Sequence, residues 1–273
     1  MKITIYDFLN RRNGIDYYAD DPFIQKVVRH FAGDGWEAVD EAARKLSLQA
    51  SHRWRDLADI AARPENRPMV LHYDGHNHRI DRIVRPMETR TMEHEVFSEA
   101  LFTEKTDPWV RLVKMFLIYQ NGEAGIACPL TCTEGLAAVL DGFADTPETR
   151  RILAHYREGI DGEFGVGAQY LSEIQGGSDV PANMMEAVWD GEAWRLYGTK
   201  FFCSATHADY AVVTAKPAGS EKIALFVVPS WLPGNKAKEI SNGFTIERFK
   251  WKMGTCELCP RRRAPSAGRW PIR

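Results

Sequence analysis

The chain has 273 residues, enough for one large domain or two of ordinary size. Its 44% hydrophobic and 26% charged residues are typical of a globular protein and exclude a fibrous or largely disordered chain. A net charge of −2 provides no overall field that would attract nucleic acid or a membrane. The charge is unevenly spread, because the last 15 residues carry five arginines and no acid, whereas residues 1–258 carry 30 basic and 37 acidic side chains and sum to −7.

The five cysteines are few and odd in number, unlike the disulfide framework of a small secreted domain. Free thiols in a reducing compartment are therefore expected. Residues 1–7 lack the uninterrupted apolar core of a signal peptide. The longest strongly apolar run, residues 223–228, is far shorter than the roughly 20 residues that cross a membrane. The sequence predicts a cytoplasmic protein without a membrane segment.

Helical patterns dominate the first 165 residues. Asp20 and Asp21 stand before Pro22, as at a capped helix start, and apolar residues recur at helical spacing from Phe23 to Phe31. Residues 36–62 contain no glycine or proline, which predicts a long helix. Further helices are expected over residues 92–103, 107–119, 122–140 and 149–156.

Residues 70–80 are the exception within this helical part. Strand-like residues flank Asp74 and Gly75, a pair of residues that favours a tight turn, so a β-hairpin is expected there.

From about Gly165 the pattern changes to short runs of β-branched and aromatic residues separated by turn sequences. These runs predict six strands in a compact antiparallel barrel or sandwich, over residues 165–172, 184–189, 193–197, 210–216, 222–229 and 243–249. The expected fold class is therefore α+β. An all-α N-terminal domain (residues 1–165) precedes an antiparallel β-barrel domain (residues 166–255) and an Arg- and Pro-rich tail (residues 256–273).

Residues 169–180 hold the first sequence that points to a ligand. Gly176 and Gly177 let the backbone approach a ligand closely, and Ser178 offers a hydroxyl beside exposed amides, a combination that suits a phosphate oxygen. Taken alone, a Gly-Gly-Ser-Asp sequence is more often a plain turn with an aspartate cap.

Residues 196–205 hold the second sequence that points to a ligand. The adjacent Phe201 and Phe202 would place one ring on each face of a strand, so that one ring fills the core and the other stacks on a planar ligand. Taken alone, both rings could equally be packing residues at a barrel rim.

In this order and spacing, the two sequences resemble the middle domain of the acyl-CoA dehydrogenase family of flavoproteins. The resemblance is carried by Ser172-Glu173, by Gly177-Ser178-Asp179, and by Gly198 and Lys200 followed by Phe202 and Ser204. Within the family the chain is most similar to the alkylation-response branch, on account of residues 73–75, 128–131, 175–180, 200–204 and 226–229.

The resemblance implies FAD as the cofactor and assigns a role to each matching residue. Leu171 and Ser172 match positions whose backbone amide and hydroxyl contact the pyrimidine edge of the flavin, and Ser178 matches the residue that binds the pyrophosphate. Donors at that edge suit the negative charge that reduced flavin concentrates near N1 and O2. Phe202 matches the aromatic residue against the isoalloxazine ring, and Ser204 the hydroxyl near N5. The cofactor-binding residues are thus expected to be Leu171, Ser172, Gly177, Ser178, Phe202, Cys203 and Ser204.

The reaction implied is α,β-desaturation of an acyl-CoA thioester, in which a carboxylate takes the α-proton and the β-hydride passes to flavin N5. The resemblance also implies a homo-oligomer and leaves the electron acceptor and acyl chain length open. In the family the base lies in a C-terminal four-helix domain that is absent from this sequence, so no catalytic residue is nominated; Glu173 belongs to the flavin loop.

The end of the chain departs from the family pattern. Residues 256–273 replace an expected strand with aperiodic arginine, proline and small residues. The sequence therefore predicts a truncated product with weak or no FAD retention and doubtful activity.

Other interpretations remain open. A non-enzymatic flavoprotein of the alkylation response that associates with DNA is the main alternative, and an inactive fragment is a third. His72, His76 and His78 could suggest a metal site, but a solvated hairpin is favoured. The cysteine pairs 128/132 and 256/259 do not support zinc, and the arginines 261–263 form too short a run for a nucleic-acid patch.

Overall fold

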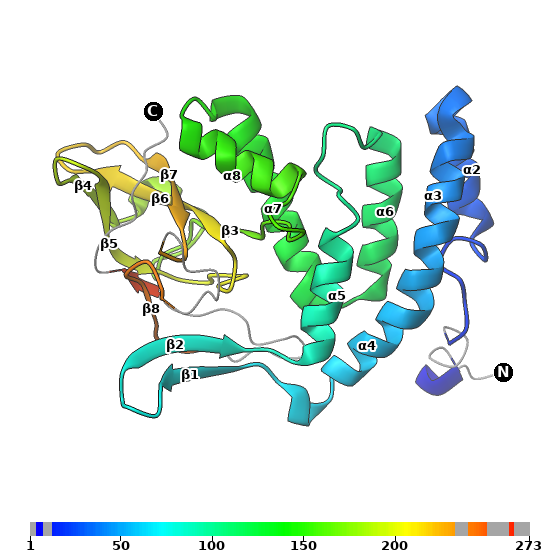
Figure 1. Cartoon of the computed structure of the whole chain (residues 1–273), viewed down its shortest axis with the longest axis horizontal. Coiled ribbons are helices and arrows are strands. Elements are labelled where there is room, and N and C mark those ends of the chain that lie inside the picture. Colours follow the sequence, from blue (N-terminus) through cyan, green and yellow to red (C-terminus); the bar gives the residue numbers. More distant parts are fainter. Residues whose placement is uncertain (1–3, 8–12, 233–239, 250–261, 265–273) are drawn as a thin grey trace. The chain divides into compact units, whose positions relative to one another are not determined.

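The computed structural model describes residues 4–7, 13–232 and 240–249 and the backbone of residues 262–264 (Figure 1). The chain divides into two compact units. The helical unit comprises residues 1–64 and 87–123, and the β unit comprises residues 65–86 and 124–273. The predicted domain boundary between residues 165 and 166 stays a prediction.

The helices of the helical unit begin where the sequence offers caps. The Asp21 carboxylate accepts the backbone N–H groups at the start of α2, and Asp107 does the same for α6, with a proline in the first turn of each helix. The helix expected over residues 36–62 is observed as α3, one π-helical turn and α4. The helices are α2 (Pro22–Ala32), α3 (Trp36–Leu48), α4 (Trp54–Ala61), α5 (Met87–Phe97) and α6 (Pro108–Asn121), with short turns η1 (Gly33–Gly35) and η2 (Gln49–Arg53).

Helix α5 lies earlier than the prediction of residues 92–103. It ends at Phe97, and the chain continues in turns in which Ala100 has a positive φ of 51°. Leu101 and Phe102 are buried in these turns. Their apolar spacing therefore reflects packing of the turn and not continuation of the helix.

The β unit contains a hairpin, two helices and a sheet. Its elements are β1 (Met69–Tyr73), β2 (Arg79–Val84), α7 (Ala124–Phe143), α8 (Pro147–Arg157), β3 (Gly167–Tyr170), β4 (Glu186–Trp189), β5 (Trp194–Lys200), β6 (Tyr210–Pro217), β7 (Ala224–Pro229), β8 (Thr245–Ile246) and β9 (Arg262–Ala264), with short turns η3 (Pro64–Asn66) and η4 (Val180–Ala182). Strand β9 falls inside the predicted tail, and the other residues of that tail lie outside the described residues.

The sheet is mixed, so the prediction of an antiparallel barrel is wrong in strand direction. Its order is β3-β6-β4-β5-β9-β8, with β7 paired to β6. Both β3 and β4 run parallel to β6, whereas the other pairs are antiparallel. Strand β6 has neighbours along both edges, and its residues 210–215 are all buried. Such a continuous buried run is typical of a central strand with parallel neighbours.

Helix α7 fixes the position of β3. The backbone N–H of Gly167 donates to Thr133 Oγ1 at 2.8 Å, and a Cβ at Gly167 would lie 2.9 Å from the Cα of Thr133. Only glycine permits this close approach of strand and helix. Helix α7 has the length and apolar composition of a membrane-spanning helix, a property that it shares with core helices of soluble proteins. Its side chains join the core of the β unit, which contains Leu136, Leu140, Ile152, Tyr156, Tyr210, Val212 and Val227.

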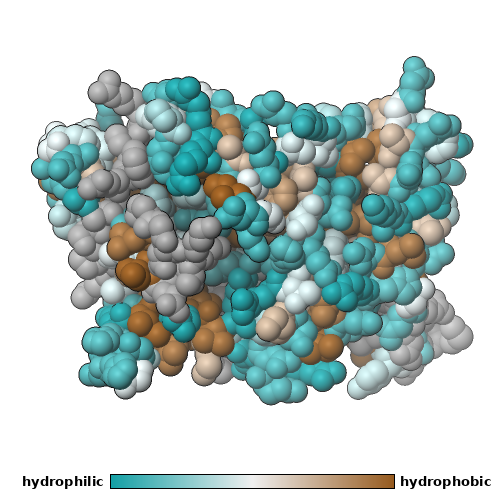
Figure 2. Space-filling view, in the orientation of Figure 1, coloured by the Kyte–Doolittle hydropathy of each residue, from teal (hydrophilic) through white to brown (hydrophobic). Residues whose placement is uncertain are grey.

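The predicted hairpin is confirmed as β1 and β2. His72 Nδ1 lies 2.6 Å from Asp81 Oδ1, and His78 Nδ1 lies 3.1 Å from Asp74 Oδ2, so each of these histidines pairs with a carboxylate of the hairpin. Alternate residues Met69, Leu71 and Tyr73 are exposed on one face, as strand periodicity requires. Hydrophobic surface is visible over this part of the molecule in Figure 2.

Candidate functional site

The two sequences that suggested a ligand meet where β3 and β5 end. Ser172 follows β3 by two residues, and Phe201 directly follows β5. The Phe201 N–H donates to the Ser172 carbonyl at 2.9 Å. A backbone hydrogen bond therefore joins segments that are about thirty residues apart in the chain.

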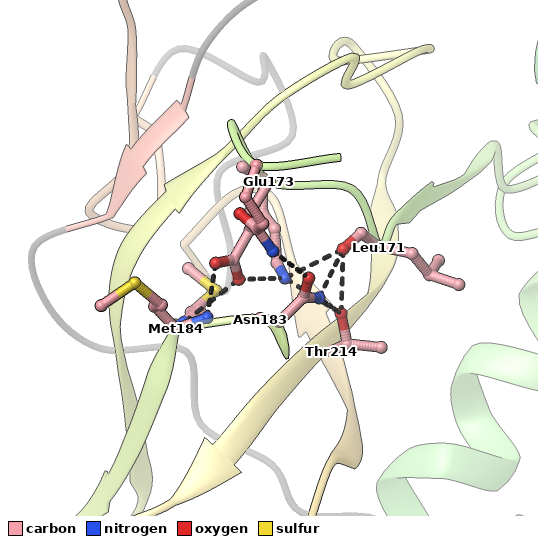
Figure 3. Close-up of polar contacts among 8 residues, drawn as sticks. Leu171, Glu173, Asn183, Met184 and Thr214 are labelled. Carbon is pink, nitrogen blue, oxygen red and sulfur yellow. Dashed lines mark hydrogen bonds and ion pairs between the residues drawn. The ribbon is translucent and has the colours of Figure 1, made fainter. Parts of the chain in front are cut away.

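A buried ion pair lies beside this junction (Figure 3). Lys200 Nζ is 2.7 Å from Glu173 Oε1, and their side chains are 1% and 6% exposed. Burial lowers the pKa of Lys200, and the hydrogen bond to Glu173 opposes that shift. Because a buried charge without a partner is strongly destabilising, each of the two residues depends on the other.

The Leu171 carbonyl is the centre of the polar network in Figure 3. It accepts hydrogen bonds from Asn183 Nδ2 at 2.6 Å, Lys200 Nζ at 3.2 Å and Thr214 Oγ1 at 3.3 Å. No described peptide bond is cis. In a trans peptide the C=O and the following N–H point in opposite directions, so the N–H of Ser172 points away from the buried network. The network thus orients a backbone donor at a predicted flavin contact.

Glu173 closes the loop that contains Ser178. Its Oε2 accepts the Met184 N–H at 2.6 Å and its Oε1 accepts the Met185 N–H at 3.1 Å. The carboxylate therefore connects the first residue of the loop to the residues that follow its end. Gln175 Nε2 also donates to Asn183 Oδ1 at 3.0 Å within the loop.

Gly177 brings the loop close to Ser172. A Cβ at Gly177 would lie 2.3 Å from Ser172 Oγ, so a side chain there would force the Ser172 hydroxyl or the loop to move. Gly176, Gly177 and Ser178 are exposed, and Ser172 is half-buried. The Ser172 hydroxyl and the exposed stretch of Gly176, Gly177 and Ser178 therefore lie close together on the β unit.

The phenylalanines lie differently from the prediction that they occupy opposite faces of a strand. Strand β5 ends at Lys200, and Phe202 adopts a left-handed backbone with a φ of 59°. The Phe202 ring is 44% exposed and contacts Phe201 edge to face, with 4.4 Å between ring centroids. A turn, and not strand alternation, presents this ring. Ser204 is half-buried and Cys203 is fully buried, so the thiol of Cys203 packs in the interior.

Two members of the network were not found from the sequence. Asn183 and Thr214 are 0% and 2% exposed, and Asn183 Nδ2 donates to Thr214 Oγ1 at 3.0 Å. Thr214 lies in the middle of an otherwise apolar strand run, and that position was the available signal. Asn183 lies in a turn, where a polar residue is ordinary, so nothing in the sequence distinguished it.

Two family models match the chain. The model of the acyl-CoA dehydrogenase middle domain matches residues 168–259, and the model of the adaptive response protein AidB N-terminal domain matches residues 9–156. The second match spans more than half of the chain. The chain belongs to the acyl-CoA dehydrogenase family, in its AidB-like branch. The resemblance seen in the sequence is therefore confirmed.

The relatives are distant in sequence. Putative acyl-CoA dehydrogenase AidB of Escherichia coli is 26% identical over 266 residues, covering 89% of this chain and 46% of the relative. The chain spans about half the length of the curated relatives it matches. Two solved structures share the fold. Caenorhabditis elegans ACDH-11 in complex with C11-CoA has a TM-score of 0.79 at 22% identity, covering 92% of this chain and 45% of that one. A Bacillus anthracis acyl-CoA dehydrogenase complexed with FAD has a TM-score of 0.59 at 15% identity, covering 91% and 36%.

Proposed function

We propose that the β unit binds FAD and that the protein acts in the oxidation of acyl-CoA thioesters between Cα and Cβ. The observation that carries the proposal is the meeting of the two segments at the ends of β3 and β5. It places the half-buried Ser172, the exposed Gly177 and Ser178 and the exposed Phe202 on one unit.

The chemistry of these residues fits a flavin nucleotide. The backbone of Gly177 approaches Ser172 so closely that a Cβ there would clash with the Ser172 hydroxyl, and Gly177 lies within a stretch of exposed residues, 174–179. Exposed amides and a serine hydroxyl suit the phosphate oxygens of a dinucleotide, and an exposed phenyl ring suits a planar ring system. The set offers both kinds of contact, as FAD requires.

In this proposal each residue contributes binding or orientation. The backbone amide and the hydroxyl of the Leu171–Ser172 pair contact the pyrimidine edge of the flavin, Ser178 donates to the pyrophosphate, and Phe202 packs against the isoalloxazine ring. Gly177 provides the close backbone approach, and Ser204 offers a hydroxyl near N5 while the buried Cys203 fixes the turn. Bound FAD supplies the two-electron oxidation that desaturation needs.

The proposed substrate is an acyl-CoA thioester. It follows from family membership and from the acyl-CoA complex of the similar ACDH-11 structure. No carboxylate among the described residues is assigned as the base that removes the α-proton, so the role proposed for this chain is cofactor binding and orientation.

Titration of the purified protein with FAD tests the proposal. Quenching of flavin fluorescence and a shifted absorption band are expected on binding, and a subsequent change in the spectrum is expected when an acyl-CoA is added. Wild-type protein that leaves the fluorescence and absorption of FAD unchanged would contradict the proposal. Unmodified coenzyme A serves as the control for the acyl group.

DNA association is the second candidate, because the matched N-terminal model is that of an adaptive response protein. The charge of −7 over residues 1–258 disfavours contacts with phosphate oxygens. The test measures DNA binding by a variant in which the arginines at 261, 262, 263, 269 and 273 are neutralised. If this variant still binds DNA, with an affinity that falls steeply as the salt concentration rises, the result would favour this candidate.

A further inference from the structure

We infer that Glu173 and Lys200 are positioning residues that make the site select FAD over shorter flavins. The inference rests on the proposed flavin site and adds to it the physical basis of the choice between flavins. Riboflavin and FAD share the isoalloxazine ring, and only FAD contains a pyrophosphate. A residue that positions the Ser178 loop therefore affects the affinity for FAD and not that for riboflavin.

Glu173 is such a residue because its carboxylate joins the two ends of that loop. The Met184 and Met185 N–H groups lie 2.6 and 3.1 Å from its oxygens, and the side chain is almost fully buried. Of the residues between, 174–179, which include Ser178, are exposed, and Asn183 is buried. An exposed loop that is fixed at its base loses less conformational freedom when a ligand binds, and this preorganisation increases affinity.

Lys200 connects this closure to the rest of the site. Its ammonium group has three donors and three acceptors within reach: Glu173 Oε1 at 2.7 Å, Thr214 Oγ1 at 2.9 Å and the Leu171 carbonyl at 3.2 Å. Lys200 is also the last residue of β5, directly before the segment that carries Phe202. One buried side chain thus links the Ser178 loop, the Leu171 peptide and the aromatic segment.

Thr214 belongs to the same network but makes no hydrogen bond to the Glu173 carboxylate or to the Met184 and Met185 N–H groups. Its hydroxyl donates to the Leu171 carbonyl at 3.3 Å and accepts from Asn183 Nδ2 and from Lys200 Nζ. Removing the hydroxyl leaves the bonds from Glu173 to Met184 and Met185 in place. Thr214 therefore affects the Leu171–Ser172 peptide, whereas Glu173 affects the Ser178 loop.

The two positions should have different effects on flavin preference. Glu173→Asp keeps a negative charge near Lys200, but its shorter side chain withdraws the carboxylate from the Met184 and Met185 N–H groups. The contact to Lys200 Nζ lengthens as well, because Oε1 accepts from both Lys200 and Met185. We expect FAD affinity to fall about tenfold or more while riboflavin affinity changes little, since charge-assisted hydrogen bonds are lost at the loop. Thr214→Val should weaken FAD and riboflavin alike, by about fivefold, because it removes a donor to the Leu171 carbonyl and leaves the bonds from Glu173 to Met184 and Met185 in place.

The test compares dissociation constants for FAD and riboflavin, from fluorescence quenching, together with Tm in the absence of flavin. The variants are Glu173→Asp, Thr214→Val and the double variant Glu173→Gln/Lys200→Met, which removes both buried charges at once. Glu99→Gln/Lys114→Met, in the helical unit, is the matched control because it removes another ion pair, one of 2.6 Å. The ratio of FAD affinity to riboflavin affinity should fall in Glu173→Asp and in the double variant, and stay constant in Thr214→Val and in the control.

Three outcomes would overturn the inference. If Glu173→Asp folds and its ratio of FAD affinity to riboflavin affinity is unchanged, Glu173 has no role in selecting FAD. A Glu173→Asp protein that unfolds while the control folds assigns the pair to stability alone. A ratio that falls equally in Thr214→Val removes the distinction between the two positions. Wild-type protein that binds neither flavin instead contradicts the proposed function.

Discussion

Asp81 in β2 and Ile246 in β8 are 165 residues apart, and the Asp81 carboxylate accepts the Ile246 N–H at 2.9 Å. The same carboxylate accepts from Arg79 Nε at 3.0 Å, and Arg79 also donates to the Ile246 carbonyl at 3.2 Å. The Asp81 side chain is 4% exposed. The hairpin is thereby bonded to the sheet of the β unit, although residues 1–64 and 87–123, on either side of it in sequence, belong to the other unit.

Asp81→Ala should lower the free energy of unfolding by about 2–3 kcal/mol, because it leaves a buried N–H and a guanidinium without their acceptor. Asp81→Asn should be milder, since its amide oxygen can still accept from Ile246 and since asparagine tolerates the positive φ of 43° found there. Urea denaturation measures both variants. Equal stability of Asp81→Ala and wild type would contradict the role of this contact.

Gly177→Ala should weaken FAD binding by roughly tenfold, because the added methyl group would lie 2.3 Å from Ser172 Oγ and must displace either that hydroxyl, a proposed flavin contact, or the loop. Gly142→Ala is the control, because it adds a methyl group in α7 where no atom lies within 4 Å. Fluorescence titration compares the two variants. The expectation fails if both variants bind FAD as the wild type does.

Thr133→Val should destabilise the β unit by about 1–3 kcal/mol, since the isosteric side chain cannot accept the buried N–H of Gly167. Thr131→Val places the same substitution on the same helix at an exposed position and should have a small effect. Thermal unfolding distinguishes them. Equal changes in Tm would show that the loss comes from helix propensity instead.

Asp190 should give the turn between β4 and β5 a pH-dependent stability. Hydrogen bonds from the Ala193 and Glu192 N–H groups, and then from Arg195, lower the pKa of Asp190 to about 2. A carboxyl group with a lowered pKa stabilises the fold above its ordinary value of 3.8, and this contribution disappears as the pH falls towards about 2.

The corresponding experiment compares wild type with Asp190→Asn. The Tm of the wild type should exceed that of the variant at neutral pH, and the difference should vanish near pH 2. A difference that persists unchanged at low pH would show that the charge of Asp190 does not contribute.

Local patterns predicted most elements because their causes are local. The caps at Asp21 and Asp107, the Asp74 turn and the apolar strand runs each depend on residues within a few positions. Which residues of a helix are buried was harder to predict from the sequence. Phe23 and Phe31 follow the helical spacing of α2, yet they are 74% and 58% exposed, and Val28 is the buried residue of that helix. Periodicity defines a face, but the packing partners determine which residues on it are covered.

The sequence by itself determined the order of helices and strands, the hairpin, and the family resemblance carried by residues 171–204. The tertiary structure decided that β3 and β4 run parallel to β6, and that Lys200 and Glu173 form a buried pair with Asn183 and Thr214. The physical reason is the distance along the chain over which the interactions act. Backbone preferences and caps act between neighbours in the chain, whereas strand direction and the pairing of buried charges depend on groups that come together only when distant segments pack.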